Sequence, residues 1–327
     1  MRLATTNDQR KLSAILENAD NDSWRHAFRV AALANDIPSL MELSTRSGAL
    51  SQPPVLQFWL ASVLRSAGAV NEAQALLRCG QQQHPEDFWL NFQLGMVLTF
   101  GKENVINSLE RQEQEAVGYF RAAVAIRPTS AIARNYLGVA LGRIHQLDSA
   151  LVEFRAASKL DPSYAVPHSN LGLALQYKGD PEGAISEYRQ AIKLDSSYAL
   201  AHNNLAMLLS TCSDPKFLSP LQAVAEAQRA VELEPESGMY WNTLGEAHYS
   251  AGDWNEAISA LEKSIALKKK GDSEDYFFLA MAHWHLGHES EALDWYQKGV
   301  DWMEKNDPKS TELLHFRTSA AKLLGVK

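Results

Sequence analysis

Residues 165–198 read AVPHSNLGLALQYKGDPEGAISEYRQAIKLDSSY, and the residues just before them, 131–164, read AIARNYLGVALGRIHQLDSALVEFRAASKLDPSY. Both stretches hold a leucine followed by a small residue, Gly138 or Gly172, inside a first apolar run. In both, a later alanine begins a second amphipathic run. Apolar residues spaced three and four apart indicate helices, so each stretch predicts two helices joined by a turn.

The same helix pair can be followed along most of the chain. When the small residue after the leucine is numbered position 8 of its repeat, seven repeats begin at intervals of 34, 43, 34, 34, 39 and 35 residues. The longer intervals predict insertions at 101–112 and 211–220, between the two helices of their repeats. With insertions included, the predicted repeats are 54–87, 88–130, 131–164, 165–198, 199–237, 238–272 and 273–307.

Both ends of the chain depart from this pattern. Residues 1–22 form an N-terminal extension, and residues 23–53 predict a degenerate helix pair that caps the first repeat. Residues 308–327 carry one amphipathic helix. We expect that helix to cover the apolar face that a last repeat would otherwise expose to water.

Several positions of the repeat have a physical role. The small residue at position 8 lets the first helix, helix A, approach the second, helix B, where a larger side chain at position 24 fills the space between them. Asp180 and Asp253 are the expected N-caps of two B helices, and Glu256 would complete a capping box with Asp253. Glycines that supply the left-handed residue after helix A are expected at Gly68, Gly179, Gly252 and Gly287. Prolines that end helix B are Pro85, Pro128, Pro162 and Pro235.

The 34-residue period and this pattern resemble the tetratricopeptide-repeat (TPR) family, over roughly residues 20–327. The resemblance implies an all-α fold: a TPR superhelix, or right-handed α-solenoid, of about seven helix-turn-helix repeats with capping helices at both ends. Residues 203–206 (NNLA), 211–215 (TCSDP) and 240–245 (YWNTLG) resemble the TPR tails of bacterial serine/threonine protein kinases and related stand-alone TPR proteins. In such tails the repeats are thought to recruit partners or substrates, which implies a kinase association.

Composition narrows the function classes. The net charge of −8 and the pI of about 5.7 argue against nucleic acid and acidic membrane surfaces as partners. The two cysteines, Cys79 and Cys212, form no metal or redox motif, which favours a reducing compartment, and we expect a cytoplasmic protein. We find neither a secretory signal nor an apolar run of about 18 residues that could span a membrane.

No motif for catalysis is found. The kinase signatures, a phosphate-binding loop and any local nucleophile-base arrangement are missing, so we expect a non-enzyme with no cofactor and no bound metal. Among His283, His285 and His288, the first two point about 200° apart on a helix and cannot share an ion. We interpret these histidines as core or surface residues, and Lys268–Lys270 as cations at a helix C-terminus.

The candidate site is the groove lined by the A helices. By resemblance, positions 2, 5, 6, 9, 12 and 13 face it. Amide side chains there could grip a peptide backbone, since they donate and accept at once. Asn170 and Asn204 share position 6 and resemble two rungs of the asparagine ladder of protein O-GlcNAc transferases. The predicted groove residues are Asn135, Arg143, Asn170, Gln176, Tyr177, Asn203, Asn204, Met207, Asn242, Glu246, Tyr249, Met281 and Trp284.

These observations predict a non-catalytic scaffold that binds an extended peptide or a protein segment in the groove. One alternative is the regulatory or substrate-recruiting tail of a serine/threonine kinase, and another is the accessory TPR domain of a glycosyltransferase. Some groove residues could instead pack between helices. A chaperone-type Glu-Glu-Val-Asp tail is not the expected partner, because only Asn170 matches the carboxylate clamp of TPR domains that bind such tails.

Overall fold

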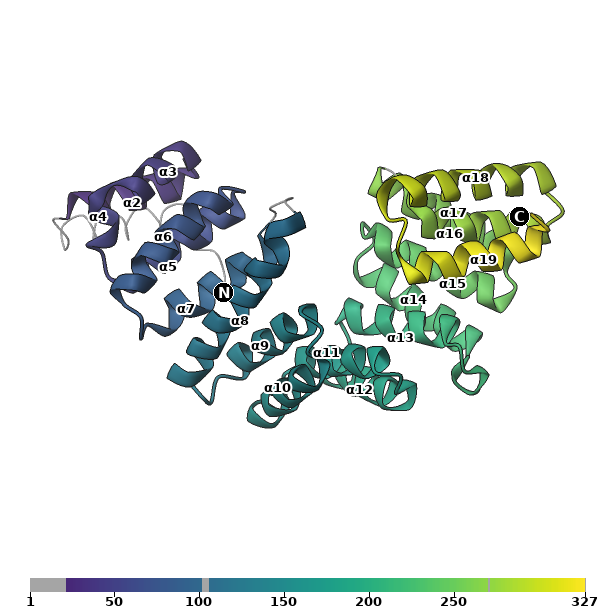
Figure 1. The fold of residues 1–327 in the computed structure, drawn as a ribbon, viewed down its shortest axis with the longest axis horizontal. Coiled ribbons are helices and arrows are strands. Elements are labelled where there is room, and N and C mark those ends of the chain that lie inside the picture. The colour runs from purple at the N-terminus through teal and green to yellow at the C-terminus, as the bar shows by residue number, and fades with distance from the viewer. Residues whose placement is uncertain (1–21, 102–105, 270, 327) are drawn as a thin grey trace. The chain divides into compact units, whose positions relative to one another are not determined.

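The computed structural model describes residues 22–101, 106–269 and 271–326, and it contains helices and no strand among them. The fold is therefore all-α, as predicted. The chain divides into two compact units, Met1–Leu160 and Asp161–Lys327, which we call the N-terminal and C-terminal units (Figure 1).

The N-terminal unit begins with three helices that precede the repeats, and three A–B pairs follow. The leading helices are α2 (Ser23–Ala34), α3 (Ile37–Thr45) and the short α4 (Ser47–Leu50). The A helices are α5 (Pro54–Ser66), α7 (Phe88–Phe100) and α9 (Ala131–Arg143), and the B helices are α6 (Val70–Gln83), α8 (Ile106–Ile126) and α10 (Leu147–Leu160).

The C-terminal unit contains four A–B pairs and a last helix. Its A helices are α11 (Ala165–Tyr177), α13 (Ala199–Thr211), α15 (Gly238–Ala251) and α17 (Ser273–His285). Its B helices are α12 (Pro181–Leu194), α14 (Pro220–Leu233), α16 (Trp254–Lys268) and α18 (Glu289–Asn306). The 3₁₀ helix η1 (Pro215–Phe217) precedes α14, and α19 (Thr311–Leu324) ends the unit.

Within each unit, every helix A contacts its own helix B and the helix A of the next repeat, as in a solenoid. Both predicted insertions fall between a helix A and its helix B, and residues 102–105 of the first lie outside the described residues. The first differs in one respect, because α8 begins at Ile106, so that part of the insertion lengthens helix B. In the second insertion, η1 interrupts the segment between α13 and α14.

Close contact between helices A and B depends on position 8. A Cβ atom added at Gly138 would lie 2.5 Å from the Phe154 ring, and one added at Gly172 would lie 2.7 Å from the Tyr188 ring. Where position 8 is alanine, position 24 is smaller in two of the three cases, Leu77 opposite Ala61 and Ala227 opposite Ala206. The glycine thus makes room for an aromatic side chain that fills the layer between the two helices.

The turns agree with the sequence in most details. Gly68, Gly179, Gly252 and Gly287 all have positive φ angles, between 76° and 84°, as predicted. Asp180 caps α12 by accepting a hydrogen bond from the Gly183 N–H. The predicted capping box of Asp253 and Glu256 is wrong, because the Asp253 side chain makes no cap hydrogen bond. Instead, Asp253 Oδ2 lies 3.5 Å from His248 Nδ1.

The C-terminal end of the array is covered by α19. Phe316, Ala320 and Leu324 of this helix are buried in one cluster with Phe278 and Met281 of α17. The rings of Phe278 and Phe316 have centroids 5.2 Å apart. The last helix therefore covers the apolar face of the final repeat, as the sequence predicts.

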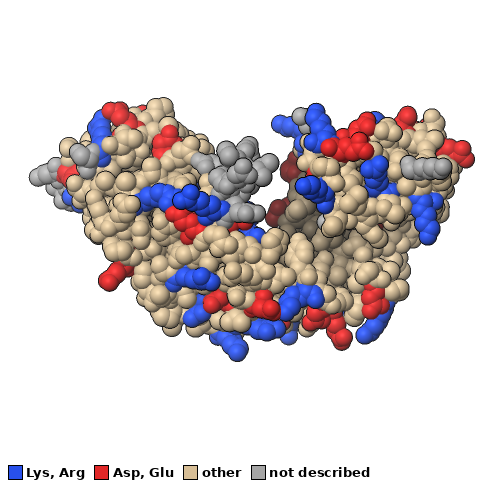
Figure 2. Space-filling model, in the orientation of Figure 1, with Lys and Arg blue, Asp and Glu red and all other residues tan. Residues whose placement is uncertain are grey.

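Charged side chains are mixed over the surface. On the face shown in Figure 2, lysine and arginine alternate with aspartate and glutamate in both units, between broad areas of uncharged atoms. Some charged side chains pair across repeats, as in Arg143–Glu113 at 2.8 Å. The described part of this face has no large area of one sign of charge that would attract a strongly charged partner.

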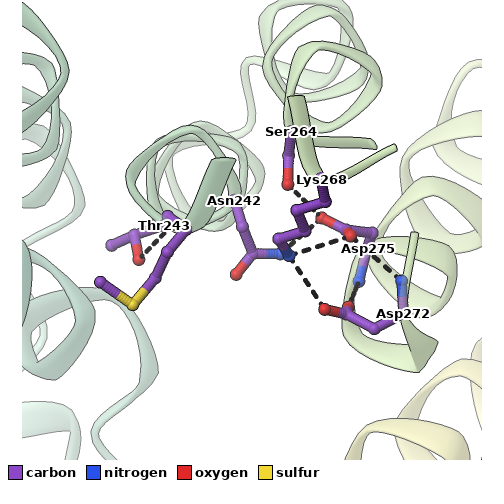
Figure 3. A network of polar contacts seen from close by, with 7 residues as sticks. Asn242, Thr243, Ser264, Lys268, Asp272 and Asp275 are labelled. Carbon is purple, nitrogen blue, oxygen red and sulfur yellow. Dashed lines mark hydrogen bonds and ion pairs between the residues drawn. The ribbon is translucent and has the colours of Figure 1, made fainter. Parts of the chain in front are cut away.

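A buried carboxylate joins the last two repeats (Figure 3). Asp275 of α17 is fully buried. Its Oδ1 accepts hydrogen bonds from Asn242 Nδ2 of α15 at 2.9 Å and from Ser264 Oγ of α16 at 2.7 Å. Its Oδ2 lies 3.1 Å from Lys268 Nζ, which also contacts Asp272 at 2.9 Å. One side chain thus links three helices, and every contact is to a donor.

The pKa values of the two aspartates in this network shift in opposite directions. Burial and the neighbouring Asp272 raise the pKa of Asp275, against the opposing effect of Lys268. Burial also acts on Asp272, but the Lys268 ammonium outweighs it and lowers the pKa of that carboxyl. Asp272 and Asp275 additionally form a capping box at the start of α17. Lys268, interpreted from the sequence as a cation at a helix end, is therefore the counter-ion of a buried carboxylate pair.

We predict that Gly138→Ala destabilises the N-terminal unit by about 1–3 kcal/mol, because the new methyl group overlaps the Phe154 ring. Adding Phe154→Leu, which reproduces the Ala61 and Leu77 combination, should recover part of this loss. Urea denaturation of the single and double variants measures the coupling. Strictly additive effects would show that the two residues do not constrain each other.

We also predict that Lys268→Met lowers the local stability of α17 by about 3 kcal/mol near pH 7, because it leaves a buried carboxylate without its cation. The loss should shrink as the pH falls. A carboxyl whose pKa in the folded state lies above its pKa in the unfolded state contributes stability below the unfolded pKa, and this stability is lost as the pH rises through the folded pKa. Removing Lys268 raises the folded pKa of both aspartates. Native-state hydrogen exchange of the α17 amides at about pH 4.5 and 7 measures this.

Lys263→Met provides the control, because Lys263 lies on the same helix, α16, and is exposed. It should leave α17 unchanged at both pH values. An equal loss at both pH values in Lys268→Met would contradict the assignment of Lys268 as the counter-ion.

Candidate functional site

The predicted groove residues differ widely in accessibility. Those at position 5 are buried rather than on an open face. Asn242 donates from its side chain to Asp275 of the next helix A. Asn135 and Asn203 occupy the same position and are 1% and 3% exposed. These three asparagines are therefore not accessible to a partner.

Six of the thirteen predicted groove residues are buried in the structure, and seven are at least partly accessible. The buried residues are Asn135, Asn203, Asn204, Asn242, Glu246 and Met281. The accessible residues are Arg143, Asn170, Gln176, Tyr177, Met207, Tyr249 and Trp284. Of the two asparagines at position 6, Asn170 is partly exposed and Asn204 is 8% exposed.

Some accessible residues already have protein partners. Gln176 accepts a hydrogen bond from the Tyr188 hydroxyl at 3.0 Å, and Arg143 pairs with Glu113 at 2.8 Å. The Tyr249 hydroxyl lies 3.4 Å from His285 Nε2, and burial raises the pKa of this tyrosine. Tyr177, at the end of α11, is 72% exposed and presents its ring to solvent.

The predicted residues leave out an apolar position that is accessible. Position 2, in the first turn of helix A, is apolar in six of the seven repeats and is Glu274 in the last. The apolar residues are Val55, Trp89, Ile132, Val166, Leu200 and Met239. All of them are partly or largely exposed. An apolar residue that recurs at one position in six of the seven repeats is the signal by which the sequence identifies them.

The A helices of the N-terminal unit carry most of the exposed large apolar side chains found on A helices. Phe92 and Phe120 are buried, and Tyr136 packs on both, with ring centroids 5.4 and 6.0 Å away. Exposed rings lie on this base, with Trp89 5.3 Å from Phe58 and Phe100 6.0 Å from Tyr136. The exposed apolar residues of this face are Val55 (51% exposed), Trp59 (59%), Trp89 (40%), Phe100 (45%) and Ile132 (53%). We call these five the aromatic face.

A shallow groove of about 430 Å³ opens beside Trp89. Phe92 and Ile132 line it together with the turn between α8 and α9. The Arg127 guanidinium lies over the Phe88 ring, 4.3 Å from its centroid, and 5.4 Å from the centroid of Trp89. The groove thus combines an apolar wall with a cation held by aromatic rings.

The histidines of α17 have structural neighbours. His283 Nδ1 lies 3.3 Å from His288 Nδ1, and burial together with His288 lowers the pKa of His283. His285 stacks on Trp254, with centroids 4.6 Å apart. No group of three or more potential metal-ligating residues occurs within the described ranges. Nor does any described helix combine the length and the apolar character needed to cross a bilayer.

Family models of known proteins match two segments of the chain, each about one repeat long. A family model described as TPR repeat matches residues 177–210, and one described as tetratricopeptide repeat matches residues 238–270. No curated protein sequence matches the chain. The resemblance to kinase tails therefore stays a hypothesis.

Solved structures share the fold at low sequence identity. A chain in the crystal structure of the APC/C hetero-tetramer Cut9–Hcn1 is 16% identical with a TM-score of 0.64, and the match covers 97% of this chain but only 60% of that one. A tetratricopeptide repeat protein of Parabacteroides merdae is 11% identical with a TM-score of 0.55, over 82% of this chain and 97% of that one. PilF of Pseudomonas aeruginosa is 18% identical with a TM-score of 0.53, over 70% and 96%.

The matched repeats, the glycine-dependent pairing of helices A and B and the solenoid neighbours agree with one another. The chain is a tetratricopeptide-repeat protein.

Proposed function

We propose that the protein is an interaction scaffold whose A helices bind a segment of another protein. The observation that carries this proposal is the aromatic face of the N-terminal unit. Single exposed apolar residues are ordinary on protein surfaces, but clusters of them mark interaction sites. Here five large apolar side chains on three successive A helices are 40–59% exposed.

The rings of this face are held in place before any partner arrives. Trp89 contacts Phe58, Phe88 and Phe92, with centroid distances of 5.3, 5.0 and 6.3 Å. A partner would therefore order few side chains on binding, which lowers the entropic cost of association. Tryptophan and tyrosine are also the residues most enriched among those that dominate binding energy.

The chemistry of the face indicates the kind of segment that it would bind. Apolar or aromatic side chains of the partner would cover Trp59, Trp89 and Ile132, with one of them entering the groove beside Trp89. Arg127, held over Phe88, could donate from its guanidinium edge to a backbone carbonyl of that segment. The partner is thus a segment with spaced apolar side chains rather than one defined by charge.

The C-terminal unit offers a second, more polar face, with Asn170, Tyr177 and Met207 among its accessible members. We propose that this face makes amide and apolar contacts of its own, with Asn170 as the backbone-binding amide. If the chain acts beside a serine/threonine kinase, as the sequence resemblance implies, these faces would recruit the substrate.

We predict that Trp59→Ala combined with Ile132→Ala weakens binding of a selected peptide by about 2 kcal/mol, roughly thirtyfold. Both side chains are more than half exposed, so folding should change little. The peptide is obtained by selecting a displayed random library on the immobilised full chain, and calorimetry then measures its affinity for wild type and variant.

The control is Val152→Ala combined with Leu221→Ala, two residues of B helices that are 61% and 81% exposed. It should bind the peptide as wild type does. If both double variants bind equally well, or if selection enriches only charged peptides, the aromatic face is not the binding site.

A further inference from the structure

A second groove lies in the C-terminal unit, where the insertion before α14 meets α12. The insertion is fixed at several points. Its 3₁₀ helix η1 is capped by Asp214, which accepts from the Lys216 N–H at 3.0 Å. The Ser219 N–H donates to the Leu209 carbonyl at 2.9 Å, which ties the end of the insertion back to α13. The insertion is therefore an ordered wall rather than a loose loop.

The groove between this wall and α12 has a volume of about 700 Å³. Its apolar lining is Ile185, Leu209, Phe217 and Leu218. Its polar lining is Glu182, Ser186, Arg189, Gln190, Lys193, Lys216, Ser219 and Gln222. The lining belongs to α12, α13, η1 and α14, so the groove is formed within the C-terminal unit.

The charge of this groove is opposite to that of the protein. Three cations, Arg189, Lys193 and Lys216, line it with one carboxylate, Glu182, whereas the chain as a whole carries a net charge of −8. The one ion pair among them joins Lys216 and Glu182 at 3.9 Å, between side chains that are 70% and 79% exposed, and such a pair is weak.

The other two cations lack a carboxylate partner. Arg189 donates to the neutral amide of Gln222 at 3.2 Å, and Lys193 has no carboxylate within ion-pair distance among the described residues. Elsewhere the guanidinium groups of Arg78 and Arg134 are neutralised by Glu115 and Glu153. The groove therefore retains positive charge next to apolar side chains.

We propose that this groove binds an acidic segment of a partner protein. Carboxylates of the segment would pair with Arg189 and Lys193, which lie four residues apart on α12. An apolar side chain between these carboxylates would pack on Ile185, Phe217 and Leu218. Amide and hydroxyl groups of Gln190 and Ser219 are placed to bond its backbone. Charge complementarity selects this occupant, because the rim is cationic on an acidic protein and the floor is apolar.

The surface is separate from the aromatic face, so each can fail without the other. The groove also depends on the insertion. The preceding B helix, α10, carries Arg155 and Lys159 at the same two repeat positions as Arg189 and Lys193 on α12. Both are exposed, but the repeat of α10 carries no insertion. That repeat supplies a matched control.

The test is fluorescence anisotropy of the full chain with a labelled glutamate-rich peptide that carries one phenylalanine. We expect saturable binding that weakens as the salt concentration rises. Salt screens the attraction between the glutamates and the cations, because the Debye length falls from about 10 Å at 0.1 M to about 3 Å at 1 M ionic strength. Arg189→Glu with Lys193→Glu should reduce affinity at least about tenfold. Arg155→Glu with Lys159→Glu, the same change of charge at the same positions, should leave it within about twofold.

Other results would overturn the proposal. Equal loss in both double variants would show a general effect of charge rather than a groove. Equal binding of the same peptide with every glutamate replaced by lysine would exclude selection for acidic segments. Displacement of the peptide by millimolar inorganic phosphate would indicate a simple anion site. A dimer in light scattering that Arg189→Glu with Lys193→Glu dissolves would assign the groove to a second copy of the chain. Circular dichroism and thermal melts of each variant verify that the fold is kept.

Discussion

The close approach of helix A to helix B at position 8 is the contact on which the rest of the fold depends. Glycine at this position allows the rings of Phe120, Phe154 and Tyr188 to lie directly against the backbone of helix A. The ring then fills the layer between helices A and B, and this contact fixes the rotation of helix A about its own axis. With one side of helix A fixed in this way, position 5 is turned toward the next repeat and position 2 toward solvent. The proposed binding face is thus a consequence of how the repeat packs.

Positions 5 and 2 of helix A have different surroundings, so the side chains at these two positions have different roles. Asn242, at position 5, bonds to the buried Asp275 and helps hold two repeats together. Ile132, at position 2, is 53% exposed, and Trp89, at the same position, packs on Phe58 of the preceding helix A and is still 40% exposed. The N-terminal unit has more exposed large apolar side chains on its A helices, whereas the C-terminal unit carries the buried polar network and the cationic groove. The partners that we propose for the two units differ accordingly, apolar for one and acidic for the other.

Most of the fold could be predicted from the sequence, because every repeat has a small residue at position 8 and four of the seven have a glycine of positive φ after helix A. The candidate site could be predicted only in part. An asparagine on helix A has the same chemistry whether it faces a peptide or a neighbouring helix, and only the depth of the layer places Asn135 and Asn203 in the interior. The predicted box of Asp253 and Glu256 gave way to that of Asp272 and Asp275 because cap geometry depends on backbone angles as well as on spacing. The course of the second insertion, and hence the cationic groove, has no counterpart in the repeat pattern.

Hydrogen exchange of the full chain, with and without a saturating selected peptide, tests most directly whether the A helices are the binding face. The account predicts slower exchange in α5, α7 and α9 and unchanged exchange in α6 and α10. Peptide-induced protection confined to α6, α8 and α10, with the A helices unaffected, would contradict it and would place binding on the opposite side of the repeats.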